Sequence, residues 1–335
     1  MLQNRSGISI VVCTHNGKNR LPPVLSALMD QSLLPGMFEL IVIDNASTDG
    51  TTLFCEQFLS EAECVFSWQV VLEQQQGLNH ARHRGLTVAQ FDVVLFCDDD
   101  NALSRDYLQL GLSLLKDNPA IGALGGCGIP SFETAKPVWF DTYSHSFAVG
   151  PQSKHDGRIL HDPAEVYGAG TFFRKGILLR FFEKGFHATM TDRKGNTLAS
   201  GGDVEWCYLV QLAGYEIWYD HRLTFIHQMP EGRLRWSYYL RLKAGIASGT
   251  GRLLPYICLL KNHQASWFTF GFNWFSQAVR STLIYFKFYV SAWILQKNRK
   301  PESELAAVVL RQKMTSYWKH GGSGFRHFKL LKRML

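Results

Sequence analysis

The stretch Val93-Val94-Leu95-Phe96-Cys97-Asp98-Asp99-Asp100 does most to decide the fold. Its first five residues are apolar and uncharged, which is typical of a short strand buried within a sheet. Three carboxylates follow directly, and alternate residues of an extended segment point the same way, so Asp98 and Asp100 can share one target. Because crowded carboxylates repel one another unless a cation neutralises them, we expect these two to bind Mn²⁺ or Mg²⁺. An acidic turn or a helix cap is the alternative interpretation.

Strand-like and helix-like segments alternate on the N-terminal side of this stretch. Apolar runs predict strands at 8–13, 38–43, 68–72 and 93–97, and helices are predicted at 21–31, from about 51, and at 77–89. Strands and helices that alternate at this length predict an α/β protein with a parallel, doubly wound sheet. Ligands of such sheets bind at the carboxyl ends of the strands, and polar clusters follow three of the predicted strands, at 14–16, 44–45 and 98–100.

Composition and missing motifs exclude several other classes of protein. Hydrophobic residues make up 46% of the 335 residues, which is enough for a core and excludes wholesale disorder. The seven cysteines show no CxxC spacing, which argues against a disulfide framework or a zinc site and favours the cytoplasm. The early polar residues argue against a signal peptide, and the first predicted strand is followed by neither GxGxxG nor a Walker lysine motif.

Five motifs, in this order along the chain, resemble those of the family 2 glycosyltransferases. They are Thr14-His15-Asn16, Asp44 to Thr51, Gly77 to Gly85, Asp98-Asp99-Asp100 and Gly201 to Glu205. The resemblance covers roughly residues 7–230 and implies a GT-A fold, an inverting reaction and a nucleoside-diphosphate sugar donor. We therefore expect a GT-A-like, mostly parallel (Rossmann-like) domain at 1–230, with a donor half at 1–126 and an acceptor half at 127–230. A helical C-terminal extension is expected at 231–335.

The resemblance also implies roles for residues of the donor half. Asp44 matches the position that holds the base or ribose, and Arg82 matches a basic position near the nucleotide or its phosphates, although a solvated helix face is the alternative for Arg82. Some relatives use a histidine near the place of His227 for metal or diphosphate contact, and a structural histidine is the alternative there. The residues expected to bind the donor nucleotide are Thr14, Asn16, Asp44, Arg82, Asp98 and Asp99, and those expected to bind metal are Asp98, Asp100 and His227.

The acceptor half offers one candidate base. Asp203 opens a predicted helix at 204–213, at the position of a Glu-Asp motif whose Asp is the general base in the family, although Gly202 replaces the first acid. Residues two apart diverge on a helix, so Glu205 is the weaker candidate for the acceptor side. Gly168 and Gly170 lie in a small-residue turn that would let a sugar approach the backbone, unless the turn is an ordinary one.

Aromatic residues offer further interpretations of the second half. Trp139 can form a stacking wall for an acceptor sugar, with core packing as the alternative. From 273 to 295 the pattern is helical and nearly apolar, but two internal charges argue against a simple spanning helix. Aromatic and basic residues over 265–300 fit a helix lying on an anionic membrane surface. Packing on the catalytic domain or on a second copy of the chain, as a homodimer, is the alternative.

The resemblance thus implies a metal-dependent, inverting glycosyltransferase that acts on a glycan or lipid-linked glycan, and it alone implies a setting in bacterial surface polysaccharide or glycolipid assembly. We expect it in the cytoplasm, or peripheral on the inner face of the plasma membrane. The basic tail carries no recognised nucleic-acid-binding motif, so we expect no nucleic-acid partner. A catalytically silent nucleotide-sugar binding module is one alternative, because of Gly202. A sugar-nucleotide pyrophosphorylase is another, although the glycine-rich basic loop of such enzymes is missing.

Overall fold

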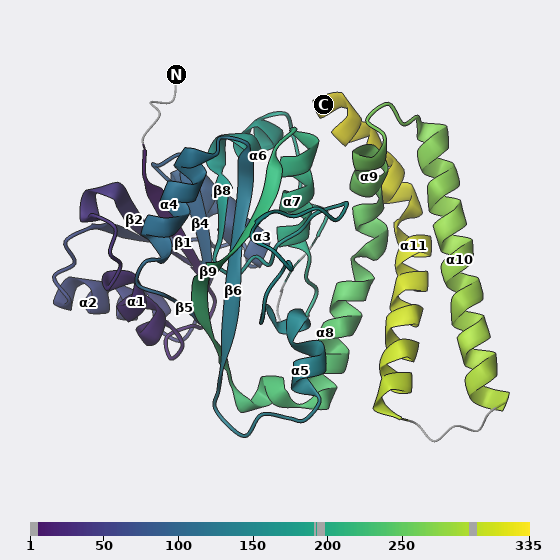
Figure 1. Cartoon of the computed structure of the whole chain (residues 1–335), viewed down its shortest axis with the longest axis horizontal. Coiled ribbons are helices and arrows are strands. Elements are labelled where there is room, and N and C mark those ends of the chain that lie inside the picture. The colour runs from purple at the N-terminus through teal and green to yellow at the C-terminus, as the bar shows by residue number, and fades with distance from the viewer. Residues whose placement is uncertain (1–5, 191, 193–197, 295–299) are drawn as a thin grey trace.

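A computed structural model of the chain describes residues 6–190, 192, 198–294 and 300–335 (Figure 1). Over these residues, one sheet has the strand order β3-β2-β1-β4-β8-β6-β9-β5, and β7 (Gly157–Arg158) pairs with β9. The GT-A-like α/β fold with a helical C-terminal region, which the sequence predicts, is confirmed.

The first half of the sheet is parallel, as the alternation of strands and helices predicts. Its register sets Thr14 beside Asp44, and Cys13 beside Asp98, so the polar groups that end these strands reach one edge. The strands are β1 (Ile8–Thr14), β2 (Phe38–Asp44), β3 (Ser67–Leu72) and β4 (Val93–Asp98). The intervening elements are α1 (Leu21–Met29), η1 (Pro35–Met37), α2 (Thr51–Glu61) and α3 (Leu78–Val88).

The second half of the sheet is mixed. The short strand β8 (Thr171–Arg174) is antiparallel to both β4 and β6 (Ile121–Phe132). β9 (Glu216–Met229) runs parallel to β6 and antiparallel to β5 (Asn101–Leu103), which sets His227 opposite Asn101, next to the aspartate run. The helices here are α4 (Tyr107–Asp117), α5 (Phe140–Tyr143), η2 (Ser144–Phe147), α6 (Lys175–Glu183) and α7 (Gly202–Leu212).

Two hydrophobic clusters cover the two faces of the sheet. Along β1, Ile10 and Val12 belong to one cluster and Val11 to the other, because alternate residues of a strand face opposite sides. The first cluster includes residues of α1, α2 and α4, and the second includes residues of α3, α6 and α7. Burial on both faces explains why these strands are continuous apolar runs.

The C-terminal helices extend the second cluster outward from the sheet. Buried Phe328 and Leu331 join it together with Tyr256 and Leu259, so this region shares a core with the α/β domain. Figure 1 shows α10 and α11 side by side, with α9 between α11 and the sheet. Among the described residues, none of the helices combines the length and apolar character needed to cross a membrane. The elements are η3 (Glu231–Leu234), α8 (Trp236–Ser248), α9 (Thr250–Lys261), α10 (Trp267–Ile294) and α11 (Pro301–Met334).

The helix expected over 273–295 begins six residues earlier than predicted, at Trp267. Residue 295 itself, like the rest of 295–299, lies outside the described residues. Trp274 anchors α10 to α11, since its indole N–H donates to the carbonyl oxygen of Tyr317 at 2.7 Å. A β-carbon at Gly321 would lie 2.5 Å from the Trp274 ring, so this close helix contact requires glycine.

Candidate active site

A cavity of about 200 Å³ opens at the carboxyl ends of β1 and β4. Asp99 is held there from two sides: the Thr14 hydroxyl donates to its Oδ2 at 2.6 Å, and Arg20 donates to both carboxylate oxygens at 2.6 and 3.2 Å. Thr14, Asp98 and Asp99, which the sequence predicts to bind the donor nucleotide, line the cavity. Arg20 also lines it, at the N-terminal end of α1, but sequence reasoning missed this residue. The sequence feature that could have indicated Arg20 is a basic side chain directly after the polar turn that follows β1.

Two residues predicted to line this cavity point elsewhere. Asp44 is buried, and its carboxylate accepts hydrogen bonds from the Ser47 N–H at 2.9 Å and from the Thr52 hydroxyl. Asn16 accepts the Thr48 N–H at 2.8 Å, which ties the loop after β1 to the loop after β2. Both side chains therefore order loops rather than face the cavity. Asn45, which sequence reasoning did not assign, lines it instead.

The predicted metal ligands Asp100 and His227 come together around a third residue. Asp100 is 3% exposed, and its Oδ1 lies 3.5 Å from His227 Nε2. Arg233, from η3, places Nη2 at 2.5 Å from Asp100 Oδ2 and Nη1 at 2.9 Å from His227 Nε2. The Arg233 side chain is only 16% exposed.

Asp98, Asp100 and His227 offer the oxygen and nitrogen ligands that suit a divalent cation. Arg233 already places a positive charge between Asp100 and His227, so this position suits a cation. The three expected ligands nevertheless do not converge on one point while Arg233 is there. Within the described ranges, one group of three potential ligands has its ligand atoms within 4.8 Å of one another: exposed Asp156 and His221 with buried Asp220. That Asp98, Asp100 and His227 bind a metal therefore stays a prediction, which requires Arg233 to leave Asp100.

A larger cleft of about 600 Å³ begins at Asp98 and runs toward the C-terminal helices. Asp203, in the first turn of α7, lines it, and the Asp203 Oδ2 atom accepts the Gly168 N–H at 2.7 Å. Gly168 also lines the cleft, and a β-carbon there would lie 2.9 Å from the β-carbon of Asp203. Glycine is therefore required for the backbone to approach Asp203. The sequence predicted both residues on the acceptor side, and both face this cleft.

Arg82 lies in the wall of the same cleft and is 7% exposed, so the alternative of a solvated helix face is wrong. Its Nη1 lies 3.1 Å from Asp192 Oδ2. Burial opposes the charge of Arg82, but Asp192, Asp203 and Asp98 outweigh that effect, and the pKa of Arg82 is raised. Sequence reasoning missed Asp192, because nothing in the local pattern of its loop marks it.

Three other residues predicted on the acceptor side do not face the cleft. Glu205 is fully buried and accepts hydrogen bonds from the Thr189 N–H and the Tyr256 hydroxyl, so it ties α7 to α9. A β-carbon at Gly170 would lie 2.7 Å from the Tyr107 hydroxyl, since this glycine packs against the core. Trp139 packs in an aromatic cluster with Phe140, Phe147, Trp236 and Tyr239, which is the core packing left open by the sequence.

The far end of the cleft is formed by helices of the C-terminal region, which the sequence did not predict. Lys243 and Ile246 of α8 line it together with Val309 and Lys313 of α11. These positions depend on how the helices pack on the domain, and no local motif marks them.

Comparison with known proteins shows the family of this chain. The model of glycosyl transferase family 2 matches residues 9–182, which is more than half of the chain. Glycosyltransferase AglE of Haloferax volcanii is 24% identical over 232 residues, covering 68% of this chain and 69% of AglE. The poly(ribitol-phosphate) beta-glucosyltransferase of Bacillus spizizenii is 26% identical over 167 residues, covering 46% of this chain and only 26% of that protein.

Among solved structures, the mannosyltransferase PcManGT from Pyrobaculum calidifontis, in complex with GDP-Man and Mn²⁺, shares the fold with a TM-score of 0.59. It is 18% identical, and the match covers 95% of this chain and 88% of PcManGT. Motif order, fold and family model thus agree, and this chain belongs to glycosyl transferase family 2.

Proposed function

We propose that this glycosyltransferase is metal-dependent and inverting, and that it moves a sugar from a nucleoside-diphosphate sugar to an acceptor hydroxyl. One observation carries the proposal: Asp98 lines both the 200 Å³ cavity and the 600 Å³ cleft, and Asp203 faces that cleft. A donor with its nucleotide in the smaller cavity would therefore present its sugar to an acceptor beside Asp203.

The donor end is supported by the groups that line the smaller cavity. Thr14 and Arg20 fix the Asp99 carboxylate, which leaves that carboxylate oriented to accept hydrogen bonds from the ribose hydroxyls. Asp98, Asp100 and His227 would hold a divalent cation once Arg233 has left Asp100. Such a cation, when bound, neutralises the charge that develops on the departing diphosphate.

Asp203 would act as the base. Its carboxylate accepts the backbone N–H groups of Gly168 and Val204 at 2.7 and 3.0 Å, which fixes its direction into the cleft. The acceptor oxygen forms a bond to the anomeric carbon on the face opposite the diphosphate, and the bond from that carbon to the diphosphate oxygen breaks. The hydroxyl proton passes to Asp203, and the nucleoside diphosphate leaves with the electron pair.

The far end of the cleft supports a lipid-linked glycan as the acceptor. Apolar Ile246 and Val309 lie there beside Lys243 and Lys313. Burial and the neighbouring Lys313 lower the pKa of Lys243, so an anionic group between these two lysines would be stabilised. A phosphate followed by an apolar chain has the matching chemistry. The beta-glucosyltransferase of B. spizizenii is named for a poly(ribitol-phosphate), which fits a setting in surface polysaccharide or glycolipid assembly.

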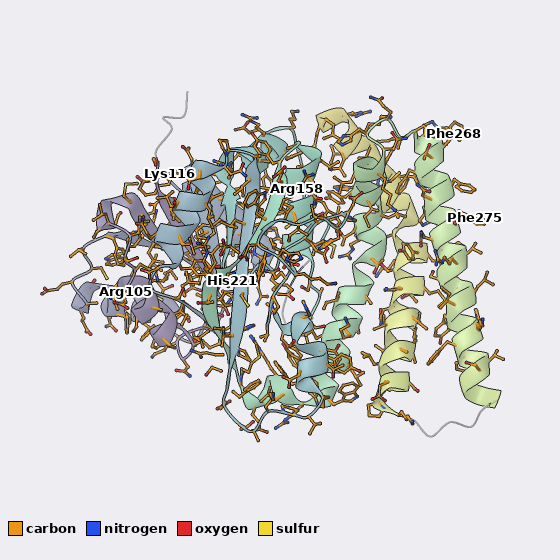
Figure 2. All side chains as sticks on the ribbon, viewed as in Figure 1. Arg105, Lys116, Arg158, His221, Phe268 and Phe275 are labelled. Carbon is orange, nitrogen blue, oxygen red and sulfur yellow. The ribbon has the colours of Figure 1, made fainter. Side chains whose placement is uncertain are left out.

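We further propose that α10 contacts an anionic membrane surface. Its outer face carries apolar side chains at least 50% exposed, and Figure 2 shows two of them, Phe268 and Phe275, pointing away from α11. Residues 265–335 contain twelve Lys and Arg but two Glu, so the charge of this region complements an anionic leaflet. The residues of the outer face are Phe268, Phe272, Phe275, Leu283, Phe286 and Val290.

The release of nucleoside diphosphate from a panel of UDP-, GDP-, dTDP- and CDP-sugars, with Mn²⁺, tests the reaction. We expect one donor class to turn over in wild type, and Asp203→Asn to lower the rate of transfer about 100-fold or more. The Asn side chain keeps the shape of Asp203, so nucleotide affinity should not change. A silent binding module would instead bind nucleotide without turnover in both proteins, and a pyrophosphorylase would release a sugar phosphate when given pyrophosphate.

A further inference from the structure

Gly202, the first residue of α7, has the carboxylate of Asp192 in the place of its side chain. The Gly202 N–H donates to Asp192 Oδ1 at 2.7 Å. A β-carbon at Gly202 would lie 2.1 Å from Asp192 Oδ2 and 2.8 Å from its carboxyl carbon. The backbone of Gly202 is not in the left-handed region, unlike that of Gly201 at φ 130°. The amide oxygen of Asn79 would lie 2.7 Å from the same β-carbon. Glycine is therefore required at position 202 by the nearer Asp192 carboxylate and by Asn79, and not by backbone conformation.

The same carboxylate is the ion-pair partner of Arg82. Asp192 Oδ2 and Arg82 Nη1 are 3.1 Å apart, and the two side chains are 4% and 8% exposed. On its other side Arg82 approaches Asp203: a β-carbon at Gly168 would lie 2.8 Å from Arg82 Nη2 and 3.2 Å from Asp203 Oδ2. Asp192, Arg82 and Asp203 thus form a continuous row at the wall of the cleft.

From this row we infer that Asp192 is a positioning residue for glycosyl transfer. Its carboxylate, which comes from outside α7, holds the guanidinium of Arg82 beside Asp203. The inference rests on the proposed function. A buried guanidinium whose partner is removed turns toward other acceptors, and here those are Asp203 and Asp98. Asp192 therefore keeps Arg82 from engaging the base and leaves Asp203 directed at the acceptor.

This arrangement explains how the chain can have glycine at position 202, where the family resemblance implies an acidic residue. Position 202 carries no negative charge, but the Asp192 carboxylate, ten residues earlier in the chain, lies where a side chain at 202 would begin. Asp192 itself adopts φ 43°, in the left-handed region that Asp, Asn and Gly tolerate best. A glutamate at 202 has its carboxyl carbon two bonds beyond Cβ, so it could replace the Asp192 carboxylate if that side chain were absent.

The test is to move the carboxylate from one position to the other. Asp192→Gly accepts the left-handed backbone and empties the space, and Gly202→Glu is then added in the same chain. With the donor that wild type turns over, Asp192→Gly should lower kcat about 100-fold, as expected for a misplaced catalytic group, and change the donor KM little. The double variant Asp192→Gly with Gly202→Glu should recover kcat to within about tenfold of wild type.

A neutral matched control separates charge from packing. Gly202→Gln in the Asp192→Gly background fills the same space without the negative charge and should not recover kcat. Equal recovery by Gln and Glu would overturn the inference, as would an Asp192→Gly enzyme that keeps its full kcat. If Asp192→Gly does not fold, Asp192→Asn keeps both the shape and the backbone tolerance, and its kcat should fall by a similar factor. If wild type turns over none of the donors, both the proposed function and this inference are wrong. If wild type is active but Gly202→Glu does not restore kcat to Asp192→Gly, the inference alone is wrong.

Discussion

Arg233 occupies the position between Asp100 and His227 where a divalent cation would have to bind. A metal can reach these ligands only in the fraction of molecules in which Arg233 has left them, and that fraction reduces the apparent affinity. Arg233→Gln removes the competing charge, so we predict that Mn²⁺ binds the nucleotide-free protein about tenfold more tightly than it binds wild type. The electron paramagnetic resonance signal of free Mn²⁺ measures this affinity directly.

Arg235→Gln is the matched control for this experiment. Arg235 lies two residues away, but it is exposed and pairs with Glu231 at 2.8 Å rather than with Asp100. Its replacement should leave Mn²⁺ affinity unchanged. Equal affinities in the Arg233 and Arg235 variants would show that Arg233 does not compete with the metal.

Residues that end a strand or open a helix could be placed from sequence, because local structure fixes where they lie. Asp98 and Asp203 are of this kind, and both face the cleft. The direction of a side chain at a strand end could not be predicted: Asp44 also ends a strand, β2, but it accepts hydrogen bonds from Ser47 and Thr52 instead of facing the cavity. Asp192 and Arg233 contact residues of the site that are far from them in sequence, Arg82 and Asp100, and no local pattern records such contacts.

At the scale of elements, buried Glu205 joins α7 to α9 through Tyr256. Burial raises its pKa to about 7, from an ordinary value of 4.5, although hydrogen bonds from Thr189 and Tyr256 oppose this. The folded protein therefore keeps this proton to a higher pH than the unfolded chain does. Protonated Glu205 therefore stabilises the folded protein fully below about pH 4.5, and this stabilisation is lost as the pH rises through about 7.

We predict that this loss reduces the free energy of unfolding of wild type by about 3 kcal/mol between pH 4.5 and pH 8. Glu205→Gln cannot ionise, so its unfolding should lack this decline. Urea titrations at several pH values measure both proteins, and the difference between them removes the contribution of other groups, such as buried His327. Parallel pH profiles for the two proteins would contradict the assignment.

Elements with a strong local pattern were predicted closely, such as the strand expected at 38–43 and found at Phe38–Asp44. The antiparallel strands β5 and β8 were not predicted, because a strand of three or four residues leaves no periodicity to detect. The length of β9 was also missed, since its polar stretch around Asp220 breaks the apolar pattern.

At the scale of the whole molecule, the outer face of α10 is apolar and lies at the far side of the helical region from the sheet (Figure 1). We predict that the protein binds vesicles that contain phosphatidylglycerol. Changing Phe268, Phe272 and Phe275 together to Ser should weaken this binding at least tenfold, because their aromatic surface is no longer transferred from water into the membrane. Co-sedimentation at low and high salt measures this. If wild type does not bind the vesicles but forms a dimer, and the triple variant is a monomer, the outer face of α10 instead binds a second copy of the chain.

The relation of the C-terminal region to the cleft could not be predicted from sequence. Its composition indicates helices with aromatic and basic faces, but not that Lys243 and Lys313 line the space that begins at Asp98. That arrangement follows from the packing of α8, α9 and α11 on the domain, which depends on contacts between residues far apart in sequence.

The central claim is that the carboxyl edge of the sheet binds a nucleoside-diphosphate sugar with the help of a metal. Calorimetric titration of UDP, GDP, dTDP and CDP, with Mn²⁺ or with EDTA, on wild type and Asp100→Asn, tests it most directly. We predict that one nucleotide binds wild type with Mn²⁺, and that its affinity is lost in EDTA and in the variant. Binding of no nucleotide, or binding that neither EDTA nor Asp100→Asn weakens, would contradict it.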